Sequence, residues 1–153
     1  MFKIPVSVLV VIHSADLQVL MMERADAPGL WQSVTGSQEF SADEQIETLR
    51  QTAIREVSEE TGLDAQTFQL TDWRMCNRYE IFPRWRHRYA PGVSQNSEHV
   101  FGLLLPTTRQ VKLAEREHLN QIWLPYEQAA EKCFSWSNAA AIRRLPVIAA
   151  PDR

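Results

Sequence analysis

The segment GSQEFSADEQIETLRQTAIREVSEETG, residues 36–62, decides the fold class of this chain. It predicts a loop followed by one amphipathic helix from about Asp43 to Thr61. Ser41 or Asp43 would cap the start of this helix, and Gly62 suits the left-handed position just past its end. Apolar residues at helical spacing form the expected buried stripe, which comprises Ile46, Leu49, Ala53 and Val57.

The end of the predicted helix carries Glu56, Glu59 and Glu60, which share one sector because a helix advances about 100° per residue. Like charges at this spacing cost about 0.2–0.5 kcal/mol per pair, and the helix dipole opposes each by a further ~0.3–1 kcal/mol. Arg55, four residues before Glu59, offsets only part of this cost. A hard divalent cation such as Mg²⁺ would reverse the penalty, whereas a solvated acidic surface is the alternative explanation.

The rest of the chain alternates strand and helix patterns irregularly, which predicts an α+β fold with helices packed on a sheet. Ser137 is a candidate cap for the last predicted helix, and Pro146 would end or kink it. The expected strands are residues 5–13, 19–24, 30–36, 68–82, 99–106 and 121–124, and the expected later helices are residues 126–134 and 137–150.

Length and composition fit one soluble domain covering residues 1–153, with 44% hydrophobic and 23% charged residues. The net charge of −3 argues against a protein that wraps a polyanion. Two cysteines, Cys76 and Cys133, without metal-ligand spacing favour a reduced compartment over a disulfide scaffold or a zinc site. The apolar run 5–12 is too short to span a bilayer and lacks a signal cleavage site, so we expect a cytoplasmic location.

Residues 55–63, REVSEETGL, resemble the second half of the Nudix box, and Glu47 lies at the expected distance before Arg55. The first half departs from the pattern, because ten residues separate Gly36 from Glu47. We interpret this spacing as a five-residue insertion at 40–44 in the loop before the helix. The resemblance implies an α/β/α sandwich on a mixed sheet that contains the acidic Nudix helix. It also implies hydrolysis of a nucleoside diphosphate linked to another group, with Mg²⁺ or Mn²⁺ as cofactor.

Further segments (3–12, 31–37, 79–82, 87–93, 117–119 and 135–138) resemble bacterial folate-pathway members of this family, which remove pyrophosphate from a pterin triphosphate. This resemblance implies Glu56, Glu60 and Glu117 as metal ligands, with Glu59 as a further candidate catalytic residue. It also implies a set of substrate-binding residues, namely Lys3, Arg24, Thr35, Tyr79, Glu80, Ile81, Phe82 and Ser135. Without it, each of these has an ordinary alternative as a solvated strand end, a turn, a core side chain or a helix cap.

Of the implied substrate-binding residues, the cations Lys3 and Arg24 would contact the triphosphate, and Tyr79 and Phe82 would hold the flat ring. The expected partner is therefore a small-molecule triphosphate, with no nucleic acid and no membrane. The basic loop RWRHRYAPGVSQNSE (84–98) fits a substrate-closing loop better than a single-strand binding site, since the chain is acidic, and a plain surface loop is a further alternative. A general (d)NTP pyrophosphatase acting on dATP or oxidised purines remains an alternative. A non-catalytic nucleotide-binding module is disfavoured, because all three box acids are present.

Overall fold

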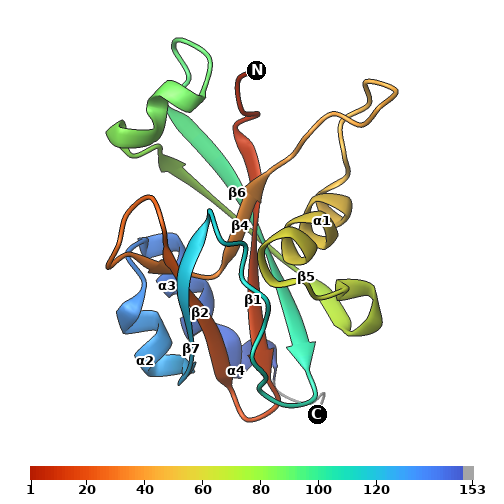
Figure 1. Cartoon of the computed structure of the whole chain (residues 1–153), viewed down its shortest axis with the longest axis vertical. Helices are drawn as coiled ribbons and strands as arrows, with labels where there is room; N and C mark the ends of the chain where they lie inside the picture. Colours follow the sequence, from red (N-terminus) through yellow and green to blue (C-terminus); the bar gives the residue numbers. More distant parts are fainter. Residues whose placement is uncertain (150–153) are drawn as a thin grey trace.

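A mixed β-sheet forms the centre of the computed structural model, which describes residues 1–149 (Figure 1). Strand β1 runs parallel to β6 and antiparallel to β2 and β4, while β5 pairs with β6 and both β3 and β7 pair with β2. All the strands expected from the sequence are present, and the predicted α+β class is confirmed. The strands are β1 (Val6–Ser14), β2 (Gln18–Arg24), β3 (Trp31–Gln32), β4 (Val34–Ser37), β5 (Gln69–Glu80), β6 (Gln95–Leu105) and β7 (His118–Pro125).

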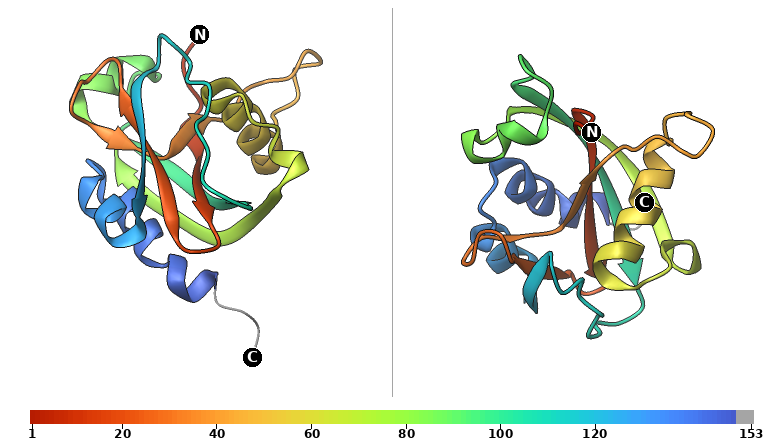
Figure 2. Two further views of the ribbon diagram at one scale, coloured as in Figure 1. Left: turned by 60° about the horizontal axis from the view of Figure 1, so that its bottom comes forward. Right: turned by 45° about the horizontal axis from the view of Figure 1, so that its top comes forward.

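Helices cover both faces of the sheet, with α1 on one side and α2 and α3 on the other (Figure 2). Alternate residues of β1 serve the two layers: Val8 and Val10 pack with α1, whereas Leu9 and Val11 pack with α2 and α3. The helices are α1 (Leu49–Thr61), α2 (Tyr126–Lys132), α3 (Trp136–Arg143) and α4 (Leu145–Ile148), with 3₁₀ turns η1 (Ala65–Thr67) and η2 (Pro83–Arg88).

Helix α1 begins at Leu49, six residues later than predicted. Thr48 and Gln51 form a capping box: the Gln51 N–H donates to Thr48 Oγ1 at 3.1 Å, and the Thr48 N–H donates to Gln51 Oε1 at 2.8 Å. Ser41 and Asp43 are therefore not the cap.

Residues 40–46 instead fold into a turn closed by a bridge between Phe40 and Ile46. Ile46 is 52% exposed and lies outside the buried stripe, contrary to the prediction. A local turn, satisfied by its own backbone hydrogen bonds, competes here with helical periodicity. Gly62 does take the left-handed conformation past the end of α1, with φ +73, as predicted.

The C-terminal helix also differs from the expectation. Ser135, not Ser137, caps α3, because its Oγ accepts from the Asn138 N–H at 3.1 Å. The helix ends at Arg143, and Pro146 lies in the first turn of α4, where a missing N–H is tolerated. The predicted end at residue 150 lies outside the described residues.

The segment predicted as a basic loop is partly ordered: Pro83–Arg88 form η2, and β6 already begins at Gln95. Cys76 and Cys133 are both free. None of the helices in residues 1–149 combines the length and apolar character needed to cross a membrane.

Candidate active site

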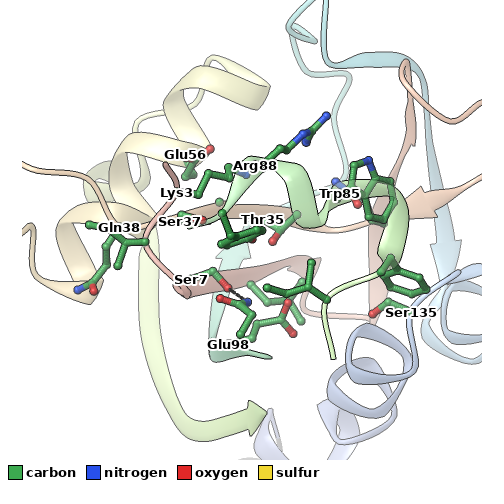
Figure 3. Close-up of a pocket in the computed structure, with 18 of the residues that line it drawn as sticks. Lys3, Ser7, Thr35, Ser37, Gln38, Glu56, Trp85, Arg88, Glu98 and Ser135 are labelled. Carbon is green, nitrogen blue, oxygen red and sulfur yellow. Dashed lines mark hydrogen bonds between the residues drawn. The ribbon is translucent and has the colours of Figure 1, made fainter. Parts of the chain in front are cut away.

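A cavity of about 1320 Å³ opens between α1, the ends of β1, β4 and β5, the turn η2 and the start of α3 (Figure 3). The structure brings together at its wall residues that are far apart in sequence, such as Lys3 and Ser135. All the site residues expected from the sequence line it: Lys3, Arg24, Thr35, Glu56, Glu59, Glu60, Tyr79, Glu80, Ile81, Phe82, Glu117 and Ser135.

Arg55 is the centre of the ionic network on α1. Its Nε and Nη2 donate to the two carboxylate oxygens of Glu47 at 2.8 and 2.9 Å, a bidentate pair. Its Nη1 donates to Glu56 at 2.8 Å and to Glu59 at 3.2 Å. The pKa of Glu47 is consequently lowered, chiefly by the Arg55 hydrogen bonds. Glu47 therefore positions Arg55, and Arg55 in turn fixes the carboxylates of the last helical turns.

Gly36 on β4 makes room for the Glu56 carboxyl group. A Cβ atom at Gly36 would overlap the carboxyl carbon and oxygen of Glu56, so any larger residue would displace that group. Burial raises the pKa of Glu56, and the positive charge of Arg55 offsets part of that rise. The close approach of helix and strand thus requires glycine at the position where the box begins.

Glu60 is the most deeply buried acid of the helix, with 2% of its surface exposed. Neither of its carboxylate oxygens has a hydrogen-bond partner among the described residues. Burial, followed by the charges of Glu56 and Glu117, holds the pKa of Glu60 well above its ordinary value. The solvated acidic surface considered as an alternative is therefore wrong for Glu56 and Glu60, whereas Glu59 is exposed and pairs with Arg55.

Glu60 meets Glu117 and His118, whose ligand atoms all lie within 4.8 Å of one another. His118 Nε2 is 3.6 Å from Glu60 Oε1. Burial, and then the charge of Arg24, lower the pKa of His118 to about 4, so its ring is neutral at pH 7. Buried carboxylates without donors, crowded by like charges, fit a hard divalent cation. Sequence reasoning missed His118, although it directly follows Glu117.

Cationic side chains stand beside the acidic group. Arg24 donates to Asp26 through Nε and Nη2, at 2.7 and 2.8 Å, and to Gln32 Oε1 at 3.0 Å. Asp26 also accepts from Arg88 at 3.1 Å and from Trp85 Nε1 at 3.2 Å. Asp26 therefore ties η2 to the end of β2, a role that the sequence did not reveal.

Lys3 lines the same cavity, and the charges of Glu56 and Glu117 act to raise its pKa. Burial, followed by the charge of Arg88, lowers the pKa of Lys3. Figure 3 shows Lys3, Arg88 and Glu56 near one another at one side of the pocket. A polyphosphate at this side of the pocket would lie between cationic and acidic side chains. Its oxygens would face the cations Lys3 and Arg88.

Aromatic rings form another part of the wall. Phe82 lies 5.5 Å from Trp85 and 5.6 Å from Phe134, measured between ring centroids. The Arg24 guanidinium lies 4.4 Å from the centroid of Trp85. Of the other expected residues, Ile81 is buried, but the Glu80 side chain pairs with Arg86 at 3.2 Å on the exposed surface. Phe134 was not expected from the sequence.

Comparison with known proteins assigns the family. A family model for the NUDIX domain matches residues 3–145, and the chain belongs to this family. It is 47% identical over 152 residues to the dihydroneopterin triphosphate diphosphatase of Escherichia coli K12, covering 97% of each chain. It is 40% identical to the protein of the same name from Haemophilus influenzae, covering 90% of this chain and 85% of the relative.

Solved structures agree with these sequence matches. The E. coli dihydroneopterin triphosphate pyrophosphohydrolase superposes with a TM-score of 0.87 at 45% identity, covering 96% of this chain and 98% of the other. A Nudix hydrolase structure from Listeria monocytogenes matches with a TM-score of 0.76 at 24% identity, covering 98% of this chain and all of the other, and supports the fold alone. The predicted Nudix sandwich is thereby confirmed.

Proposed function

We propose that this chain is a Mg²⁺-dependent pyrophosphohydrolase that cleaves 7,8-dihydroneopterin triphosphate to the monophosphate and pyrophosphate. One observation carries the substrate assignment: 47% identity along nearly the whole length of an E. coli enzyme that bears this name. The buried acids at the cavity support a hydrolytic role, because Glu60 is buried without a donor and a bound cation would offset that cost. Residues 1–153 would form a single cytoplasmic domain acting on a small molecule.

The metal would be held by Glu56, Glu60 and Glu117, with His118 adjacent to them. Mn²⁺ could substitute, since it prefers the same oxygen ligands. When bound, such a cation supplies Lewis-acid polarisation of phosphate oxygens. Arg55 orients Glu56 and favours its ionised form, and Glu59 holds Arg55 from its exposed side.

The remaining expected residues would bind the substrate. Lys3 and Arg24 would neutralise the triphosphate, and Arg24 is already oriented by Asp26. Phe82 and Tyr79 would contact the pterin ring, while Ile81 backs this strand end from the core. Thr35, Glu80 and Ser135 complete the lining through positions on β4, β5 and the cap of α3.

A product assay with dihydroneopterin triphosphate and Mg²⁺ tests this proposal. We expect pyrophosphate and the monophosphate in equal amounts, whereas release of orthophosphate would contradict it. A comparison of kcat/KM for dATP and for the pterin substrate separates the proposal from general (d)NTP hydrolysis. If Glu56→Gln and Glu60→Gln both left turnover unchanged, the assignment of catalysis to these acids would be wrong, whereas a wild-type protein without turnover would be a binding module.

A further inference from the structure

The floor of the cavity holds polar side chains that the proposed hydrolysis does not use. Asn96 and Glu98 are two residues apart on β6, so both side chains point to the same face of the sheet. They are 1% and 4% exposed, and both line the cavity. Ser7 of β1 lies beside Glu98 in the strand register. Figure 3 shows Ser7 and Glu98 together, across the pocket from Lys3 and Glu56.

Two acceptor atoms on this floor lack donors. Glu98 Oε1 and Asn96 Oδ1 are buried and have no hydrogen-bond partner among residues 1–149. Leaving such an atom unpaired costs about 1–3 kcal/mol, so a native protein keeps one only where something else satisfies it. A ligand that donates hydrogen bonds would remove this cost.

The surrounding hydrogen bonds fix the direction of these acceptors. Asn96 Nδ2 donates to Ser7 Oγ at 2.7 Å and to the Tyr79 hydroxyl at 3.0 Å. The Tyr79 hydroxyl in turn donates to Glu98 Oε2 at 3.4 Å. The Asn96 amide and the Tyr79 hydroxyl are thus engaged as donors, and these bonds hold Asn96 and Glu98 in a defined orientation.

The electrostatic setting of Glu98 differs from that of the metal acids. Burial raises the pKa of Glu98 to about 7, and the hydroxyls of Ser137 and Tyr79 offset part of the rise. The polar neighbours of the Glu98 carboxyl group are thus neutral hydroxyls. A single carboxylate with hydroxyl neighbours is a poor cation site. Neutral N–H donors from a ligand suit it better, because they stabilise the ionised form without an added charge.

We propose that Glu98 selects the heterocycle of the substrate by accepting hydrogen bonds from two adjacent N–H groups of a 2-amino-4-oxo ring edge, with Asn96 Oδ1 accepting from a further ring donor. A carboxylate offers two parallel acceptors, which match such an edge in the way that they match a guanidinium fork. The aromatic rings of Phe82, Trp85 and Phe134 line the same cavity and would contact the ring. This inference rests on the proposed function, since dihydroneopterin carries this edge.

The test compares two bare rings, pterin and lumazine, which differ where the 2-amino group of pterin is an oxo group. Lumazine would place an oxygen against the Glu98 carboxylate. We expect the wild-type protein, without metal, to bind pterin about 10- to 100-fold more tightly, as measured by NMR titration. In Glu98→Gln this preference should fall to within about threefold, mainly through weaker pterin binding. Glu127→Gln, an exposed acid on α2, is the matched control and should keep the wild-type preference.

Turnover gives a second readout with dihydroneopterin triphosphate and Mg²⁺. Glu98→Gln should raise KM about 10-fold or more and leave kcat nearly unchanged, because the ring contact is equal in the ground and transition states. The inference is overturned if the wild-type protein does not distinguish the two rings, a result independent of how any variant folds. It is equally overturned if Glu98→Gln weakens both rings alike, which would indicate a structural role.

These outcomes are separable from failure of the proposed function. If ring preference depends on Glu98 while no pyrophosphate is released from the pterin triphosphate, the reaction is wrong and the recognition stands. If pyrophosphate is released but the rings bind equally, the reaction stands and the role of Glu98 is wrong.

Discussion

The two ends of the cavity bury carboxylates in different surroundings. We call the end at Glu56 and Glu60 the phosphate end and the end at Glu98 the ring end, after the substrate groups proposed to bind there. At the phosphate end, Glu56 and Glu60 come from one helix, and Glu60 faces Glu117 and His118. At the ring end, Glu98 comes from the central strand β6 and lies among the hydroxyls of Tyr79 and Ser137. Burial raises the carboxyl pKa at both ends, but only the phosphate end adds further like charges to it.

This difference in neighbours suits the two ends of the cavity to different ligands, a cation at one and neutral hydrogen-bond donors at the other. Crowded like charges are relieved by a cation, because each carboxylate gains an attraction to it that offsets the repulsion between the acids. A single buried acid among neutral donors is relieved by more neutral donors, because they pair its remaining lone pairs. Under the two proposals, the same residue type would hold a metal ion at one end and accept hydrogen bonds from the ligand at the other.

The largest expected effect follows from Glu60→Gln, which removes charge from the phosphate end. Turnover should fall about 10³-fold, because stabilisation of several kcal/mol by the metal would be lost. The metal-free protein should melt ~2–4 °C higher, since one of three crowded acids is neutralised. Kinetic assays and calorimetry measure both effects. If both the activity and the metal-free melting temperature fell, the idea that repulsion between crowded acids destabilises the phosphate end would be wrong.

The ring end makes a prediction about pH. The pKa of Glu98 is about 7 in the folded protein against an ordinary value of 4.5, so folding favours its protonated form. This stability is fully present below pH 4.5 and is lost as pH rises through 7. Relative to wild type, Glu98→Gln should therefore gain about 2–4 kcal/mol of unfolding free energy between pH 4.5 and pH 8. Urea unfolding at several pH values checks this, with Glu127→Gln as control, and a pH-independent difference would contradict it.

Arg55→Ala tests whether the phosphate end depends on a positioning residue. Removal of the guanidinium frees Glu47, Glu56 and Glu59 together, and we expect about a 10- to 100-fold loss of kcat/KM and weaker apparent metal affinity. Arg55→Lys keeps the charge but not the bidentate geometry and should recover only part of the loss. Arg143→Ala, on the exposed side of α3, serves as the control. Full activity in Arg55→Lys would show that charge alone is sufficient.

The smallest effect concerns the cap beside the ring end. Ser135→Ala removes the acceptor for the Asn138 N–H and should cost about 1 kcal/mol of stability, or ~2–4 °C in Tm. Ser135→Thr keeps a capping hydroxyl and should lose less. Thermal unfolding of both variants provides the measurement. An equal loss in the two would indicate that packing, and not the cap, matters at this position.

The sequence placed three acids together at the end of α1 because these residues are close in the chain. The spacing of Glu56, Glu59 and Glu60 follows from helix geometry alone, and the strand patterns predicted the α+β class. The prediction of the helix start was wrong at residues 41–48. Thr48 caps the helix there, and the preceding turn makes its own backbone hydrogen bonds. Helical periodicity could not reveal this competition, since Ile46 happens to continue the apolar pattern.

What the sequence determined by itself is the family, the fold class and the acids of one helix, because these depend on local spacing along the chain. Only the tertiary structure decided that Glu60 is buried without a donor, that His118 faces it, and that Glu98 lies on the cavity floor. Burial and contact across strands depend on how distant segments pack, and both set the pKa and the unmet hydrogen bonds of these carboxylates. For this reason the chemistry of a carboxylate at either end follows from its neighbours in space.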